Sequence, residues 1–522
     1  MAPEHEADME GAMGNIDLDA SIAELEQAMA RQECCATSLC EAALQRIASL
    51  DGAGPTLRSV IEINPDAPAI AEALDLERRQ SGPRSALHGI PVLVKDSFDT
   101  GDRMMTTAGS LALVGNIASR DAFVVERLRQ AGAVLLGKTN MSEWGYMRST
   151  RACSGWSSRG GQVRNPYVLD RSPLGSSSGS AVAVAAGLCV AAIGAEVDGS
   201  IVRPASSNSI VGLKPTVGLI SRSGVIGVAD PQDTAGPMAR SVADVAALLN
   251  VLTGHDPDDP ITAEGVRRAA PDYRAFLNPA ALQGARLGVA RECFGQHEGT
   301  DGLIEQAIAQ LRQLGAVIVD PVRASALPFF GGLELELFRY GLKHSLDRYL
   351  HSHPLAPVRS LEELIRFNRD HAAAVMPYFQ QEFLEQAQTR GDLEEPACQQ
   401  VMAELRRLSR SGGIDRALRE HQLDAIIAPT EGSPPFVIDP LVGDHILPGG
   451  CSTPPAVAGY PHISVPAGFV HGLPVGLSFF AGAWQEGKLL GYAHAFEQAT
   501  RHRRPPSFLP TLGASTPQRG SL

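Results

Sequence analysis

Short apolar runs alternate with helical patterns along the first half of this chain. The runs at 91–94, 133–136 and 190–195 have the length and composition of buried strands. The segments at 121–130 and 180–186, which lie between them, have helical patterns. Because strands that alternate with helices form parallel sheets covered by helices, we predict an α/β fold. Its centre should be a twisted, mostly parallel sheet with helices on both faces.

The two ends of the chain add further elements to this pattern. Ile22, Leu25 and Met29 have helical spacing, and a second helix is predicted from Ser38, which forms a capping-box pair with Glu41. The C-terminal part contains two buried-strand runs, a hairpin pattern and a last helix, at 425–428, 462–465, 469–480 and 485–499. A hairpin joins antiparallel strands, so the predicted sheet is mixed.

The sequence favours one large domain. Its 522 residues exceed the roughly 250–300 at which a single core usually stops growing. However, no internal repeat and no Pro- or Ser-rich linker divides it. The domain should span 17–508, between flexible tails at 1–16 and 509–522. Within it, the helix-rich segment at about 300–420 is expected to shape substrate specificity.

Charge and cysteine content narrow the class of partner. The formal net charge of −13 disfavours nucleic acid, whose phosphates need basic patches. The eight cysteines form neither a C-x-x-C pair nor a zinc-ligand spacing, which indicates reduced thiols in a cytoplasmic protein. No apolar run reaches the roughly 18 residues of a spanning helix, and the acidic N-terminus lacks a signal-peptide pattern. We therefore expect no metal, no nucleic acid and no membrane partner, whereas the oligomeric state stays open.

The segment 174–216 carries the most specific motif of the chain. It contains, in order, GSSSGS at 175–180, an Ala/Val-rich helix, DGSI at 198–201 and GLKPT at 212–216. The strongly apolar helix argues against a flexible linker, and a phosphate-binding loop would need a Lys after its second glycine. The G-x-S-x-G elbow of α/β-hydrolases, with Ser177 as nucleophile, would need a preceding strand, but DRSP predicts a turn there.

This segment resembles the signature of the amidase signature family. Four further blocks resemble that family in the same order, namely HGIPVLVKD at 88–96, TTAGS at 106–110, GKTNMSEW at 137–144 and DTAGPMARS at 233–241. The resemblance covers most of 35–260 and returns over 423–504. It implies the amidase signature fold and hydrolysis of a carboxamide to acid and ammonia through an acyl-enzyme, with no cofactor.

The resemblance also implies a catalytic role for three residues. Ser200 corresponds to the nucleophile, Ser176 to a proton-relaying serine whose peptide bond is cis in the family, and Lys95 to the general base. A serine hydroxyl needs an adjacent base, and burial can lower the pKa of a lysine by up to roughly 3–5 units. Considered alone, Lys95 also suits an ion pair with Asp96, and both serines suit helix caps.

Other residues are expected to line the substrate cleft. The candidates for the oxyanion hole are the backbone N–H groups of Val197, Asp198, Gly199 and Ser200, and those for substrate binding are Ser177, Trp144 and Gly145. Asp198 is a departure, because many members of the family have glycine there. The segments DGSIV, SGWSSRGG and AGYPH resemble the peptide amidase branch, which removes ammonia from C-terminally amidated peptides. The expected substrate is therefore a short-peptide amide or a small amino-acid or aryl amide.

Three alternative functions stay open at this point. An aminoacyl-tRNA amidotransferase component would hydrolyse glutamine and need a second protein as partner. A fatty acid amide hydrolase would need an acyl channel and usually a membrane-binding patch, and no basic amphipathic helix of that kind is obvious. A non-catalytic family member would act as a binding protein, but all three triad residues are present.

Overall fold

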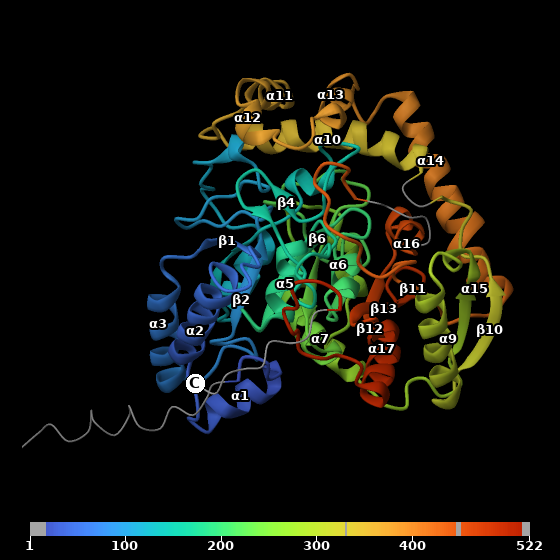
Figure 1. Ribbon diagram of the computed structural model, residues 1–522. Helices are drawn as coiled ribbons and strands as arrows, with labels where there is room; N and C mark the ends of the chain where they lie inside the picture. The colour runs from blue at the N-terminus through green and yellow to red at the C-terminus, as the bar shows by residue number, and fades with distance from the viewer. Residues whose placement is uncertain (1–16, 329–330, 445–449, 514–522) are drawn as a thin grey trace, which may run out of the picture.

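The computed structural model describes residues 17–328, 331–444 and 450–513 (Figure 1). The predicted tail at 1–16 and residues 514–522 of the predicted C-terminal tail lie outside these ranges. Residue Leu509 of the latter tail is described and forms a bridge with Val168. Its carbonyl accepts a hydrogen bond from Leu169 N at 2.7 Å.

Eleven strands of the described residues form one mixed sheet in the order β1-β3-β2-β6-β8-β7-β12-β13-β11-β9-β10. In that order, their bounds are Val60–Ile63, Val134–Thr139, Pro91–Lys95, Ala191–Glu196, Thr234–Ala239, Val211–Lys214, His462–Val470, Leu473–Phe480, Ala425–Pro429, Arg286–Ala290 and Val317–Val322. Parallel ladders join β3, β2 and β6, and likewise β11, β9 and β10. The remaining neighbours are antiparallel. The predicted α/β class with a single domain is confirmed.

Helices flank this sheet (Figure 1). Those of the N-terminal half are α1 Ile22–Ala30, α2 Ala36–Arg46, α3 Ala67–Ser81, α4 Phe123–Gln130, α5 Ser178–Ala185, α6 Val202–Ser207, α7 Val242–Leu252 and α8 Thr262–Arg268. Later in the chain come α9 Glu298–Gln313, α15 Asp415–Glu420, α16 Thr453–Ala458 and α17 Glu486–Thr500. A small ribbon pairs β4 Trp156–Ser157 with β5 Gly161–Gln162. Side chains of the helices and the sheet share one buried apolar core, which includes Val94, Val184, Leu248, Phe479 and Phe496.

Two local expectations differ from the structure. The capping box of α2 pairs Cys35 with Ser38 rather than Ser38 with Glu41, because the helix begins at Ala36 and Ser38 lies in its first turn. The amphipathic pattern at 361–390 is three helices rather than one. A break in this helical pattern is expected at Pro377, which lacks a backbone N–H and restricts the residue before it.

A separate layer of helices lies over one end of the molecule (Figure 1). We call it the helical layer, and it consists of α10 Gly332–Ser352, α11 Leu361–Asp370, α12 Ala372–Val375, α13 Glu382–Gln388 and α14 Pro396–Ser409. It has its own apolar core, which includes Trp144, Val197 and Val228 from the sheet domain. Residues 300–322 of the segment predicted at about 300–420 form α9 and β10 beside the sheet.

Arg148 connects the sheet domain to the helical layer. Its side chain is 1% exposed, and Nη1 donates to Glu143 Oε2 at 2.7 Å. Nη2 donates to the carbonyl of Val375 in α12, and the guanidinium carbon lies 5.3 Å from the ring centroids of Trp156 and Phe379.

Replacing Arg148 with Met should lower the free energy of unfolding by about 3–5 kcal/mol, because the carboxylate of Glu143 stays buried without its charged partner. Chemical denaturation followed by circular dichroism measures the change. The double variant Arg148→Met/Glu143→Gln removes the unpaired charge and should recover part of the loss. A double variant as unstable as the single one would show that the ion pair is not the cause.

Candidate functional site

The structure brings Lys95, Ser176 and Ser200 together in one hydrogen-bonded chain. Lys95 Nζ donates to Ser176 Oγ at 2.8 Å, and Ser176 Oγ donates to Ser200 Oγ at 3.0 Å. The peptide bond between Gly175 and Ser176 is cis. All three side chains are buried but line the same cavity, which has a volume of about 40 Å³.

The sheet explains why these residues meet. Strands β2 and β6 are parallel neighbours, with Val94 opposite Ile193. Their carboxyl ends therefore lie at the same edge, where ligand sites of α/β sheets form. Lys95 is the last residue of β2, and Ser200 follows β6 by a short loop. Lys95 Nζ also donates to the carbonyl of Ala195 at 2.9 Å, which fixes the amine beside that loop.

Burial gives Lys95 the electrostatic properties of a base. Desolvation lowers its pKa from 10.5 to about 7, although the nearby carboxylates of Glu196 and Asp233 oppose the shift. Burial also raises the pKa of Asp233 to about 7, so part of its opposing charge is absent at neutral pH. A substantial fraction of Lys95 is therefore uncharged near neutral pH and able to accept a proton.

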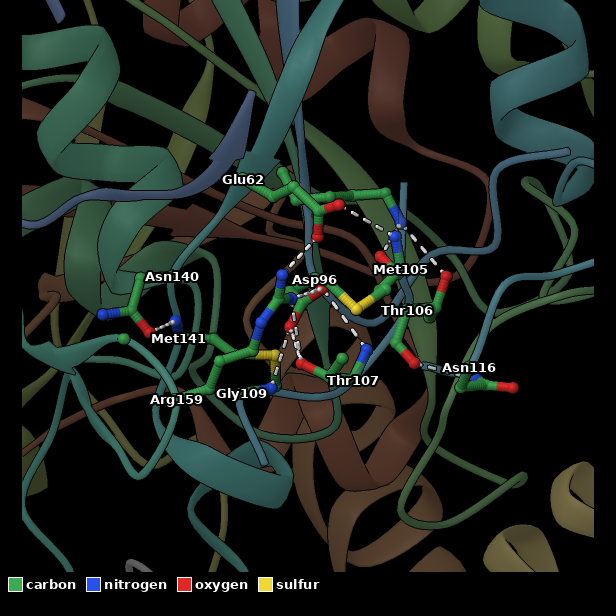
Figure 2. A network of polar contacts seen from close by, with 12 residues as sticks. Glu62, Asp96, Met105, Thr106, Thr107, Gly109, Asn116, Asn140, Met141 and Arg159 are labelled. Carbon is green, nitrogen blue, oxygen red and sulfur yellow. Dashed lines mark hydrogen bonds and ion pairs between the residues drawn. The ribbon is translucent and has the colours of Figure 1, made fainter. Parts of the chain in front are cut away.

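The interpretation of Lys95 as the ion-pair partner of Asp96 is not supported. Figure 2 shows Asp96 in a different network, where its carboxylate accepts hydrogen bonds from Thr107 and from Gly109 N, the latter at 3.0 Å. Arg159 Nη1 lies 3.6 Å from the same carboxylate, and the guanidinium also pairs with Glu62. No ion pair between Lys95 and Asp96 occurs in the described part of the chain. Asp96 thus holds the loop after β2, and Lys95 is left facing Ser176.

The loop between β6 and α6 presents N–H groups beside Ser200. Those of Asp198, Gly199 and Ser200 donate to no other group among the residues that the structure describes. Gly199 has a φ of +73°, and a Cβ there would lie 2.3 Å from Arg203 Cδ, so glycine is required. The loop therefore has free donors where a substrate oxyanion would need them.

The other predicted site residues occupy different positions. Gly145 and Val197 line the cavity. Trp144 is buried in the apolar core of the helical layer. The hydroxyl of Ser177 donates to the carbonyl of Ala195 at 3.1 Å and accepts from its N–H at 3.2 Å. The segment before Gly175 is not a strand, so the α/β-hydrolase elbow with Ser177 as nucleophile lacks its structural context.

Two residues of this region were not anticipated from the sequence. Gln232 Nε2 donates to the carbonyl of Val197 at 3.2 Å and to Glu334 Oε1 at 2.9 Å, which links α10 to the loop of Ser200. Burial raises the pKa of Glu334 well above its usual range, and the neighbouring Asp198 raises it further. Asp198 Oδ2 in turn accepts from Thr453 Oγ1 at 2.6 Å. The only sequence signal was an acidic residue on the buried face of an amphipathic helix.

Metal ligands and membrane spans are the two remaining features that bear on partners. Within the described residues, no group of three or more His, Cys, Asp and Glu side chains could hold a metal ion. No helix among them has both the length and the apolar character needed to cross a membrane.

Known proteins share the framework of this site. The native peptide amidase of Stenotrophomonas maltophilia superimposes with a TM-score of 0.88 and 50% identity, covering 94% of this chain and 99% of that one. A probable amidase from Arabidopsis thaliana is 40% identical over 504 residues, 94% of this chain and 92% of the plant protein. A glutamyl-tRNA(Gln) amidotransferase subunit from Chromohalobacter salexigens is 36% identical, covering 94% and 99%. The family model described as amidase matches residues 25–490. A match of that extent, together with relatives that align along nearly their whole length, shows that the chain belongs to the amidase family and is an amide-hydrolysing enzyme.

Proposed function

We propose that the protein hydrolyses a carboxamide to an acid and ammonia, with Ser200 as nucleophile, Ser176 as proton relay and Lys95 as general base. The observation that carries this proposal is the continuous contact from Lys95 Nζ through Ser176 Oγ to Ser200 Oγ. A lysine with a pKa of about 7 suits the role, because a general base works best when its pKa lies near the working pH.

In the proposed first step, Ser200 Oγ attacks the carbonyl carbon of the amide. Its proton passes to Ser176 Oγ while the hydroxyl proton of Ser176 passes to neutral Lys95, after both hydroxyls rotate to donate toward the amine. The N–H groups of Asp198, Gly199 and Ser200 stabilise the oxyanion. The protonated Lys95 then returns a proton along the same route to the leaving nitrogen.

The second half reaction repeats this route with water. The same base draws a proton from the water that attacks the acyl-enzyme, and the collapse of the second tetrahedral intermediate releases the acid and Ser200. Every step uses side chains and backbone of this chain, so the proposed mechanism requires neither a metal nor a cofactor.

The substrate class that we propose is a C-terminal peptide amide or a small amino-acid amide. The 50% identity to a peptide amidase supports this class, and it exceeds the 36% identity to the amidotransferase protein. The helical layer is proposed to shape the acyl side of the cavity, since Arg348 of α10 lies in its wall. The free cysteines of the described residues suit a reducing compartment, and we propose a cytoplasmic location.

An ammonia-release assay over a panel of amides tests the proposal. The panel contains peptide amides, free amino-acid amides, aryl amides, fatty amides and glutamine, each with and without EDTA. We expect the highest kcat/KM for peptide amides and no effect of the chelator. A preference for glutamine that depends on a co-purifying second protein would favour the amidotransferase alternative. No turnover of any amide would favour a non-catalytic binding protein.

A further inference from the structure

A second cavity lies where the helical layer meets the sheet domain. Its volume is about 350 Å³, compared with about 40 Å³ for the cavity of the catalytic residues. Its walls come from α8, α14, the end of α16 and the loop after β13. Neither Lys95 nor either serine of the proposed triad lines it.

One wall of this second cavity is cationic. Arg406 of α14 and Arg410, which follows that helix, both line it. Neither guanidinium forms an ion pair with a carboxylate in the described part of the chain, although Arg410 Nε donates to the carbonyl of Ala458 at 2.9 Å. Glu264 is the acidic residue in the lining, and its carboxylate is already paired with Arg267 and with Arg268. The cavity is therefore positively charged in a protein whose formal net charge is −13.

A buried polar atom faces the same space without a partner. Gln232 is 1% exposed and lines the cavity, yet its Oε1 has no hydrogen-bond partner among the described residues. Its Nε2 is already used by Glu334 and by the carbonyl of Val197. Buried polar atoms are rarely left unpaired, so an N–H or O–H donor is needed at this position.

The rest of the lining is largely apolar and aromatic. Leu337 and Val457 are buried in the apolar core of the helical layer, and Tyr460 and Trp484 contribute rings. The guanidinium carbon of Arg410 lies 5.3 Å from the ring centroid of Tyr460, which holds its charge at the edge of this apolar region. An apolar body in the cavity would therefore be covered while its charged end reaches the arginines.

We propose that this second cavity binds an organic carboxylate with an apolar or aromatic body. The carboxylate would accept charge-assisted hydrogen bonds from Arg406 and Arg410, and an N–H of the ligand would donate to Gln232 Oε1. The inference holds whichever amide the enzyme cleaves. Its occupant would contact Gln232, the residue that also contacts Val197 beside the nucleophile.

Isothermal titration calorimetry of the Ser200→Ala protein tests this site without turnover. The probes are N-acetyl-L-phenylalaninate and its neutral counterpart N-acetyl-L-phenylalaninol, which differ in the carboxylate. We expect the acid to bind and the alcohol to bind about tenfold or more weakly, because at least one charge-assisted hydrogen bond is lost. Absence of binding, or equal affinity for the two probes, would overturn the proposal.

Arginine variants in the same background then locate the site. Arg406→Gln/Arg410→Gln should bind the acid about tenfold or more weakly. The matched control is Arg407→Gln, because Arg407 lies on the same helix but pairs with Glu404 on the exposed surface, and it should bind the acid normally. Thermal denaturation checks the fold, and Arg406→Gln alone replaces the double variant if the latter is unstable. Affinity that is insensitive to Arg406 would place the acid in the catalytic cavity and refute the second site.

Discussion

Replacing Ser200 with alanine should reduce ammonia release from a peptide amide by about 10⁴-fold or more, since removal of the nucleophile ends acyl-enzyme formation. Any residual rate would come from the oxyanion donors and substrate binding, which remain in the variant. The measurement is kcat for ammonia release under saturating substrate. The fold should survive, because the hydroxyl of Ser200 contacts only Ser176 among the side chains of the described residues.

Ser177→Ala serves as the matched control for this experiment. Its hydroxyl contacts the backbone of Ala195 instead of the catalytic chain, so the variant should keep measurable turnover. The opposite result, with Ser177→Ala inactive and Ser200→Ala active, would favour the nucleophile elbow. Thermal denaturation of both variants separates a loss of chemistry from a loss of fold.

Replacing Lys95 with methionine should lower kcat by about 10²–10⁴-fold, the usual contribution of a general base. Methionine keeps the unbranched, apolar part of the side chain and removes only the amine. Lys95→Arg should be similarly impaired, since a guanidinium stays protonated and cannot accept the proton. Turnover by Lys95→Arg at near wild-type rates would show that a positive charge at this position, rather than a base, is what the reaction requires.

The pH dependence of kcat/KM follows from the same amine. Lys95 is active when neutral, and its pKa is about 7, so activity should be full above that pH. Below it, protonation should lower kcat/KM about tenfold per pH unit. The residual activity of Lys95→Met should lack this decline. A profile that stays flat well below pH 7 in the wild type would contradict the assignment of Lys95 as the base.

The sequence predicted the elements that depend on local pattern. The run at 91–94 has no charged residue and ends at Lys95, so strand β2 and the position of the amine at its end followed from the sequence. The hairpin of β12 and β13 was likewise readable, because its strands are adjacent in the chain. The catalytic roles came from the ordered motifs, and the structure brings the three side chains together.

What the sequence did not reveal depends on contacts between distant segments. Strand β6 pairs with both β2 and β8, and nothing local distinguishes its parallel neighbour from its antiparallel one. Glu334 resembles an ordinary surface residue until α10 packs against the sheet domain and brings it to Gln232, 102 positions earlier in the chain. The antiparallel ladders that join the two parallel blocks were missed in this way, since alternating strands and helices predict only the parallel part.

Gln232 has a consequence for how such an enzyme can change its substrate range. Its amide grips α10 on one side and the carbonyl of Val197 on the other, so the wall that selects an acyl group and the donors that polarise its carbonyl share one mechanical link. A substitution that shifts α10 to admit a bulkier acyl group would also tilt those donors. New specificity in this protein should therefore come with slower chemistry, unless the link through Gln232 is rebuilt at the same time.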